Sequence, residues 1–164
     1  GPILPIDPDT VAGIEALVDG PLVVVLLIGA LAPGVCEELL FRGAILGLLR
    51  TGAPSGLSVL LAGGLFGLMH LDPTRVLVTG ALGVVLGLLV VRSGSLWTAV
   101  IAHTTNNAVA FLAMRAAVGA ELGETPIAVE LGWTAVCLAA VWGVRGGRPR
   151  DASPEVILPA GGSR

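Results

Sequence analysis

The chain has 164 residues and a formal net charge of -3, and 13% of its residues are charged while 54% are apolar. A soluble domain carries about 25% charged residues, so this chain lacks the polar surface that would cover a globule of its size in water. The small net charge and the lack of a basic stripe exclude nucleic acid as an expected partner. We therefore expect one domain whose main partner is membrane lipid.

The chain divides into three parts in order. Residues 1–20 are mixed, with several prolines, glycines and acidic side chains, and predict an N-terminal loop or interfacial segment. Residues 21–145 predict a transmembrane core, and residues 146–164, rich in glycine, proline and arginine, predict a disordered tail. A span needs about 20 apolar residues, and five segments of the core come close enough to be expected spans: 21–49, 55–71, 74–91, 96–114 and 126–144. The expected fold is an all-α, polytopic transmembrane helical bundle.

Local sequence supports these boundaries and suggests how the helices meet. The second span stops before Asp72-Pro73 because proline disfavours helix in the preceding residue. Small residues four apart predict grooves for close helix–helix contact; the pairs are Gly43 and Gly47, Gly63 and Gly67, and Gly83 and Gly87.

Arginine placement predicts the orientation of the chain in the membrane. With the N-terminus outside, the inner flanks of the spans hold five arginines and the outer flanks hold two. The positive-inside rule then favours a cytoplasmic C-terminus. All nine cations are arginine, which indicates a GC-rich genome, and we expect the plasma membrane of a bacterium or archaeon.

Charged residues within the first span are the first candidate site. A charge at the centre of a membrane helix costs about 2.5–3.5 kcal/mol on insertion scales and is a functional candidate by default. Glu38 and Arg42 are four residues apart and share a helix face, so they can pair and offset each other's burial. Glu37 lies about 100° round the helix and is free to face another direction. A loop with solvated charges is the alternative, but apolar sequence continues on both sides.

The chain has two histidines, His70 and His103, in the second and fourth spans. Phe66 lies one turn before His70 and is expected to pack against its ring. Asn107 lies one turn after His103 on the same face, which Asn106 partly shares. Taken alone, His70 is typical of a helix end, and His103 with Asn107 is typical of interhelical hydrogen bonding. Their expected placement at membrane depth with two glutamates favours a catalytic site.

Three motifs in these spans resemble a known family. They are Glu-Glu-x-x-x-Arg (Glu37 to Arg42), Phe-x-x-x-His (Phe66 to His70) and His-x-x-x-Asn (His103 to Asn107). Their order, each on a separate expected span, is similar to that of the type II CAAX prenyl proteases and their bacterial relatives, the CPBP or Abi family. The resemblance covers about residues 21–144, and family members usually have further spans before this core.

The resemblance implies an intramembrane endopeptidase that cleaves a membrane-anchored protein or peptide; in the eukaryotic branch the substrates are prenylated C-terminal tails. It implies that Glu37 and His70 activate the attacking water and that His103 and Asn107 stabilise the oxyanion. Supporting roles fall to Glu38, Arg42 and Phe66. All of these roles are filled without a metal or other cofactor.

Four other functions remain open at this level. Two histidines and two glutamates resemble a zinc set, although the His-Glu-x-x-His signature is absent. A cysteine mechanism through Cys36 is disfavoured because we expect a buried thiol beside carboxylates, which oppose thiolate formation. A non-catalytic immunity or scaffold relative would keep the same fold. A proton pathway would also use buried glutamate and histidine.

Overall fold

The computed structural model describes residues 8–71, 75–116 and 127–143, and the described residues form helices and short connections without any strand. The helices follow in chain order: α1 (Pro8–Asp19), α2 (Leu22–Val24), η1 (Val25–Leu31), α3 (Ala32–Glu38), η2 (Leu39–Ile45), α4 (Leu46–Gly52), α5 (Ser55–Met69), α6 (Val76–Ser93), α7 (Leu96–Ala116) and α8 (Ile127–Gly143). The expected all-α architecture is confirmed. The predicted tail, residues 146–164, lies outside the described residues.

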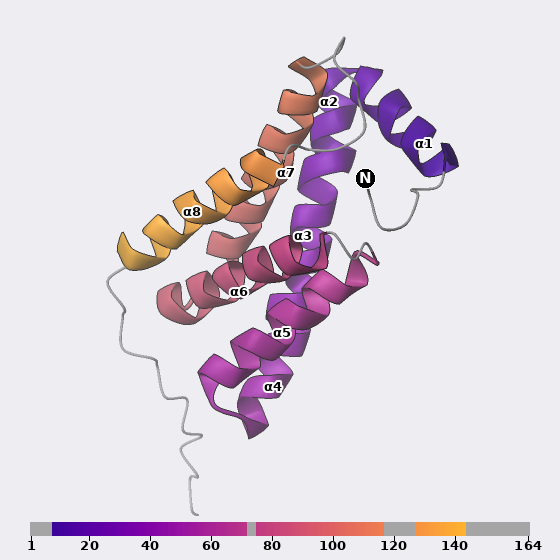
Figure 1. Ribbon diagram of the computed structural model, residues 1–164. Helices are drawn as coiled ribbons and strands as arrows, with labels where there is room; N and C mark the ends of the chain where they lie inside the picture. The colour runs from indigo at the N-terminus through magenta and orange to yellow at the C-terminus, as the bar shows by residue number, and fades with distance from the viewer. Residues whose placement is uncertain (1–7, 72–74, 117–126, 144–164) are drawn as a thin grey trace, which may run out of the picture.

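The segments from α2 to α4 form one continuous helix, Leu22–Gly52, which runs through the molecule in Figure 1. Helix α7 packs beside its N-terminal part and α5 beside its C-terminal part, while α6 contacts α5, α7 and α8. This arrangement brings the middle of the long helix, where α3 meets η2, against both α5 and α7. The three predicted motifs lie on these same helices.

Two π-helical segments, η1 and η2, flank α3 within the long helix. In each, a backbone amide bonds to the carbonyl five residues earlier: Ala32 to Leu27, and Leu46 to Phe41. Pro33 lies at the start of α3 and has no amide hydrogen to donate. Wider π turns are rare in proteins and frequently accompany functional sites. Here they enclose the turn that carries both glutamates.

Glycines let the backbones of α5 and α6 touch. A Cβ added at Gly63 would lie 2.7 Å from the amide nitrogen of Val84, and one at Gly67 would lie 2.5 Å from the carbonyl oxygen of Val76. From the other side, a Cβ at Gly83 would lie 3.0 Å from the Cα of Gly63. The grooves predicted at Gly63 and Gly67 and at Gly83 and Gly87 are therefore sites of close contact between α5 and α6. The third is not, because a Cβ at Gly47 would meet nothing within 4 Å.

Adjacent glycines on α5 give a direct test of this contact. We expect Gly63→Ala to destabilise the protein by about 1–3 kcal/mol, the usual cost of overpacking a filled interior. Its neighbour Gly64 faces open space, so Gly64→Ala should be neutral or stabilise the helix. Thermal unfolding of both variants in the same detergent measures the difference, and equal midpoints would contradict the close packing.

Many large apolar side chains lie on the outside of this fold, and a charged pair lies inside. Leu77, Leu48 and Trp97 are 81%, 73% and 68% exposed, whereas Glu38 and Arg42 are 0% and 3% exposed. Exposed apolar side chains and an internal charged pair suit a bundle whose outer faces meet lipid. The continuous helix Leu22–Gly52 and helix α6 are long and apolar enough to span a membrane, and most of each apolar window is not covered by protein. Helix α5 is apolar but shorter.

Helix boundaries agree with the expected spans to within a few residues. Helix α6 ends where Gly94 adopts a left-handed conformation, with φ at 69°, which glycine accepts without strain. Helix α5 ends at Met69, and Leu71 then has a φ of 52°. The N-terminal segment contains helix α1. Arg115 of α7 donates to the carbonyls of Val18 and Gly20 and ties α1 to the bundle.

Candidate active site

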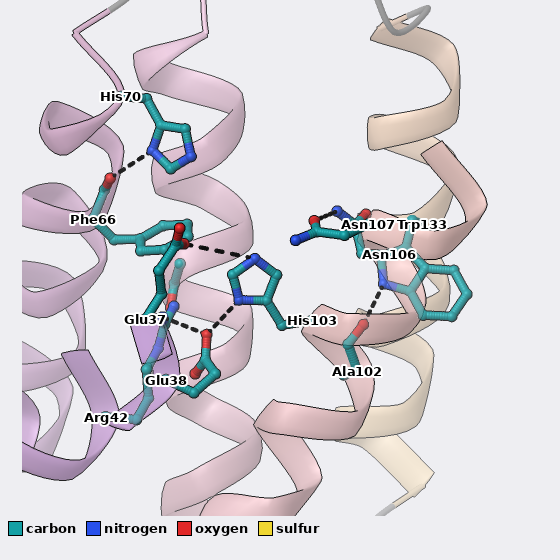
Figure 2. Close-up of polar contacts among 11 residues, drawn as sticks. Glu37, Glu38, Arg42, Phe66, His70, Ala102, His103, Asn106, Asn107 and Trp133 are labelled. Carbon is teal, nitrogen blue, oxygen red and sulfur yellow. Dashed lines mark hydrogen bonds and ion pairs between the residues drawn. The ribbon is translucent and has the colours of Figure 1, made fainter. Parts of the chain in front are cut away.

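A buried carboxylate, Glu38, is the centre of the polar cluster in Figure 2. Its Oε1 atom accepts a hydrogen bond from the Arg42 guanidinium at 2.8 Å and lies 2.8 Å from Nδ1 of His103. Glu38 is 0% exposed and His103 is 3% exposed. Glu38 therefore joins its own helix to α7, and its Oε2 atom has no partner among the described residues.

Arg42 balances this buried charge and connects three helices. Besides Glu38, its guanidinium donates to the carbonyl of Gly83 on α6 at 2.7 Å. The guanidinium carbon also lies 4.6 Å from the centre of the Phe66 ring on α5, a cation–π contact. The expected pair of Glu38 and Arg42 is thus present, and Arg42 fixes the long helix against α5 and α6.

Glu37 faces another direction, as its helix position predicts. Its side chain is 25% exposed, and its Oε2 atom lies 3.8 Å from Nε2 of His103. The imidazole of His103 consequently has a carboxylate at each nitrogen, with Glu38 at Nδ1 and Glu37 at Nε2 (Figure 2). Glu37 is therefore the glutamate whose side chain is partly exposed, whereas Glu38 is fully buried.

The Phe66 ring contacts the imidazole rings of both His70 and His103. It meets the ring of His70 at a centroid distance of 5.0 Å and the ring of His103 at 5.5 Å, both edge-on. It also packs against Phe41 at 5.1 Å. The expected contact of Phe66 with His70 is present, and Phe66 is more central than the sequence indicates because it also contacts His103 and Arg42.

The hydrogen bond of His70 fixes its tautomer. Nδ1 of His70 lies 3.0 Å from the carbonyl oxygen of Phe66, and a carbonyl only accepts, so Nδ1 carries the hydrogen. The neutral ring then presents a lone pair at Nε2. His70 closes the C-terminus of α5 and is exposed, so this nitrogen can accept a proton from a water molecule.

Asn107 lies on the same side of α7 as His103. Figure 2 shows its amide nitrogen directed toward the space beside the His103 ring, below His70 in that view. Its Oδ1 atom accepts a hydrogen bond from Nδ2 of Asn106 at 3.2 Å. The structure thus brings Glu37, His103 and Asn107 to one side of α7, and Phe66 links His70 to them.

One sequence expectation about this region is wrong. Cys36 was expected to be buried, but it is exposed on the outside of the long helix. Apolar sequence on both sides suggested burial, yet the outer faces of this bundle are apolar and not covered by protein. The thiol lies one residue before Glu37 but on the outward face, and it makes no part of the polar cluster.

Two contacts at the site were not predicted from the sequence. Glu38 was expected to pair with Arg42, but its contact with His103 depends on how α3 crosses α7 and no local pattern reveals it. Trp133 of α8 donates from Nε1 to the carbonyl of Ala102 at 3.2 Å, just before His103. A tryptophan within an apolar segment gives no sequence signal for such a bond.

Among the described residues, no three His, Cys, Asp or Glu side chains are grouped to hold a metal ion.

Comparison with known proteins identifies the family of the chain. The model of the family described as type II CAAX prenyl endopeptidase Rce1-like matches residues 19–109, more than half of the chain. The match includes the glutamates, both histidines and Asn107. No curated protein and no solved structure matches the chain. The chain is an integral membrane protein that belongs to the Rce1-like family of type II CAAX prenyl endopeptidases.

Proposed function

We propose that the protein is an intramembrane endopeptidase that hydrolyses a peptide bond of a membrane-associated protein or peptide. The observation that carries the proposal is the pair of unlike glutamates around His103: Glu38 is fully buried, whereas Glu37 stays partly open at the other ring nitrogen. One carboxylate can support the site while the other meets a reactant.

Glu37 and His70 are suited to activate the attacking water. Hydrolysis of a peptide bond needs a base within reach of the water proton. Glu37 offers a carboxylate that is 25% exposed, and His70 offers Nε2 as an acceptor because its Nδ1 hydrogen is used by the Phe66 carbonyl. A water held between these two groups would lose its proton as it attacks the substrate carbonyl.

His103 and Asn107 are suited to stabilise the oxyanion that forms. Asn107 can donate from its amide nitrogen while its oxygen is bonded to Asn106. His103 holds a hydrogen on Nδ1 for Glu38, so it donates from Nε2 when the ring carries a second proton. Carboxylate oxygens of Glu38 and Glu37 lie 2.8 Å and 3.8 Å from its two ring nitrogens. Fixed donors at a developing charge are the largest single contribution in many hydrolases.

The family description directs the choice of substrate. It names a CAAX prenyl endopeptidase, so a prenylated C-terminal tail is the first substrate to try, and an unmodified membrane-anchored peptide is the second. Under the arginine-based orientation, the C-terminus lies in the cytoplasm of a bacterium or archaeon.

The proposal is tested by comparing new protein termini in membranes that contain wild-type protein or the Glu37→Ala variant. We expect at least one cleavage product in the wild-type sample that is missing with Glu37→Ala. Glu15→Ala is the matched control, since Glu15 is an exposed glutamate on α1, and it should give the wild-type set of termini. Identical termini for wild type and Glu37→Ala would favour a non-catalytic relative.

A second measurement addresses the metal-dependent alternative. Once a cut is identified, the purified protein is assayed on that substrate with and without a tight zinc chelator. We expect unchanged cleavage, because the proposed mechanism assigns water activation to Glu37 and His70. Loss of cleavage that added zinc restores would contradict the metal-free mechanism while preserving the protease assignment.

A further inference from the structure

Two consecutive asparagines on α7 share one hydrogen bond. Nδ2 of Asn106 donates to Oδ1 of Asn107 at 3.2 Å. Asn106 is 8% exposed, and a buried polar group is costly unless it is hydrogen-bonded. The bond to its neighbour gives this amide a partner and, at the same time, fixes the neighbour.

The orientation of the Asn107 amide decides what it can do for an oxyanion. Its nitrogen end donates and stabilises negative charge, whereas its oxygen end repels it. Helix geometry places Asn107 on the His103 face but does not choose between the two ends, because the terminal torsion of asparagine is broad. A donor bonded to Oδ1 makes that choice, and Figure 2 shows the nitrogen end directed toward the space beside His103.

The helix turn before Asn106 is bonded to α8. Trp133 donates to the carbonyl of Ala102, one turn before Asn106 on α7 (Figure 2). Helix α8, which carries Trp133, lies outside the 19–109 segment that the family model matches.

We propose that Asn106 is a positioning residue that orients the Asn107 amide so that its nitrogen faces the developing oxyanion. This inference rests on the proposed function, since it assigns Asn106 a task in the same hydrolysis. It predicts that Asn106 affects catalysis through Asn107 and leaves substrate binding unchanged.

The test uses Asn106→Leu, which keeps the size of the side chain and removes its donor. We expect kcat to fall roughly 3- to 10-fold with KM unchanged, because the freed amide spends only part of its time in the productive orientation. Asn106→Asp presents an acceptor that draws the Asn107 nitrogen away, so kcat should fall about 10²-fold, approaching the effect of losing one oxyanion donor. Thr105→Val is the matched control, since the Thr105 hydroxyl bonds within its own helix to Ile101, and it should keep wild-type kcat.

A double-mutant cycle separates positioning from a general structural role. In the Asn107→Ala background, Asn106→Leu should cause no further loss of kcat, because the amide that it orients is gone. An equal loss in both backgrounds would overturn the inference while leaving the proposed function intact. If Asn107→Ala itself kept wild-type kcat, the oxyanion role within the proposed function would fail first, and the inference with it.

Discussion

Replacing Glu37 with glutamine is expected to lower kcat by about 10²–10⁴-fold, the range that a positioned general base contributes. Glutamine keeps the shape of the side chain but cannot take a proton from water. Because Glu37 is the partly exposed member of the pair, at 25%, the substitution leaves the buried contacts of Glu38 intact. The thermal unfolding midpoint should therefore stay close to that of the wild type.

The measurement compares cleavage rates and unfolding midpoints of wild type, Glu37→Gln and Glu15→Gln. Glu15 lies on α1 and is exposed, so its replacement controls for the loss of one negative charge. A Glu37→Gln protein that is stable and still cleaves at the wild-type rate would remove Glu37 from the mechanism. A large loss of stability would show that Glu37 supports the fold, contrary to its exposure.

The positions of the helices were predictable because the length of an apolar segment and the prolines that end it can be read from the local sequence. The expected starts of the second and fourth spans, at residues 55 and 96, agree with the starts of α5 and α7. The opposite surroundings of Glu37 and Glu38 were also predictable, since adjacent residues on a helix point about 100° apart and Arg42 marks the face of Glu38.

Contacts between helices were not predictable from one sequence. The bond of Glu38 to His103 depends on where α3 crosses α7, and at that crossing Gly34 approaches the backbone of Thr104, where a Cβ would lie 3.0 Å from the Thr104 Cα. Glycine is so frequent here that neither its presence nor its spacing identifies the crossing. The same reason explains Cys36, because an apolar run in a membrane protein does not distinguish a face toward lipid from a face toward protein.

Replacing Glu38 with alanine is expected to destabilise the protein by about 3–5 kcal/mol, the usual cost of leaving one member of a buried ion pair without its partner. Arg42, 3% exposed, would keep its bond to the Gly83 carbonyl but lose its counter-charge. Activity should also fall, because His103 loses the acceptor at its Nδ1 atom. Unfolding in detergent and cleavage of the identified substrate measure the two effects.

Adding Arg42→Met to this variant distinguishes the two effects. Methionine removes the unpaired charge and fills much of the same apolar space, so the double variant should recover part of the lost stability, as buried ion pairs replaced by apolar residues commonly do. Cleavage should not recover, because His103 still lacks the carboxylate that orients its ring. If cleavage returned together with stability, Glu38 would act on the fold alone, and the orientation of His103 would have to come from other contacts.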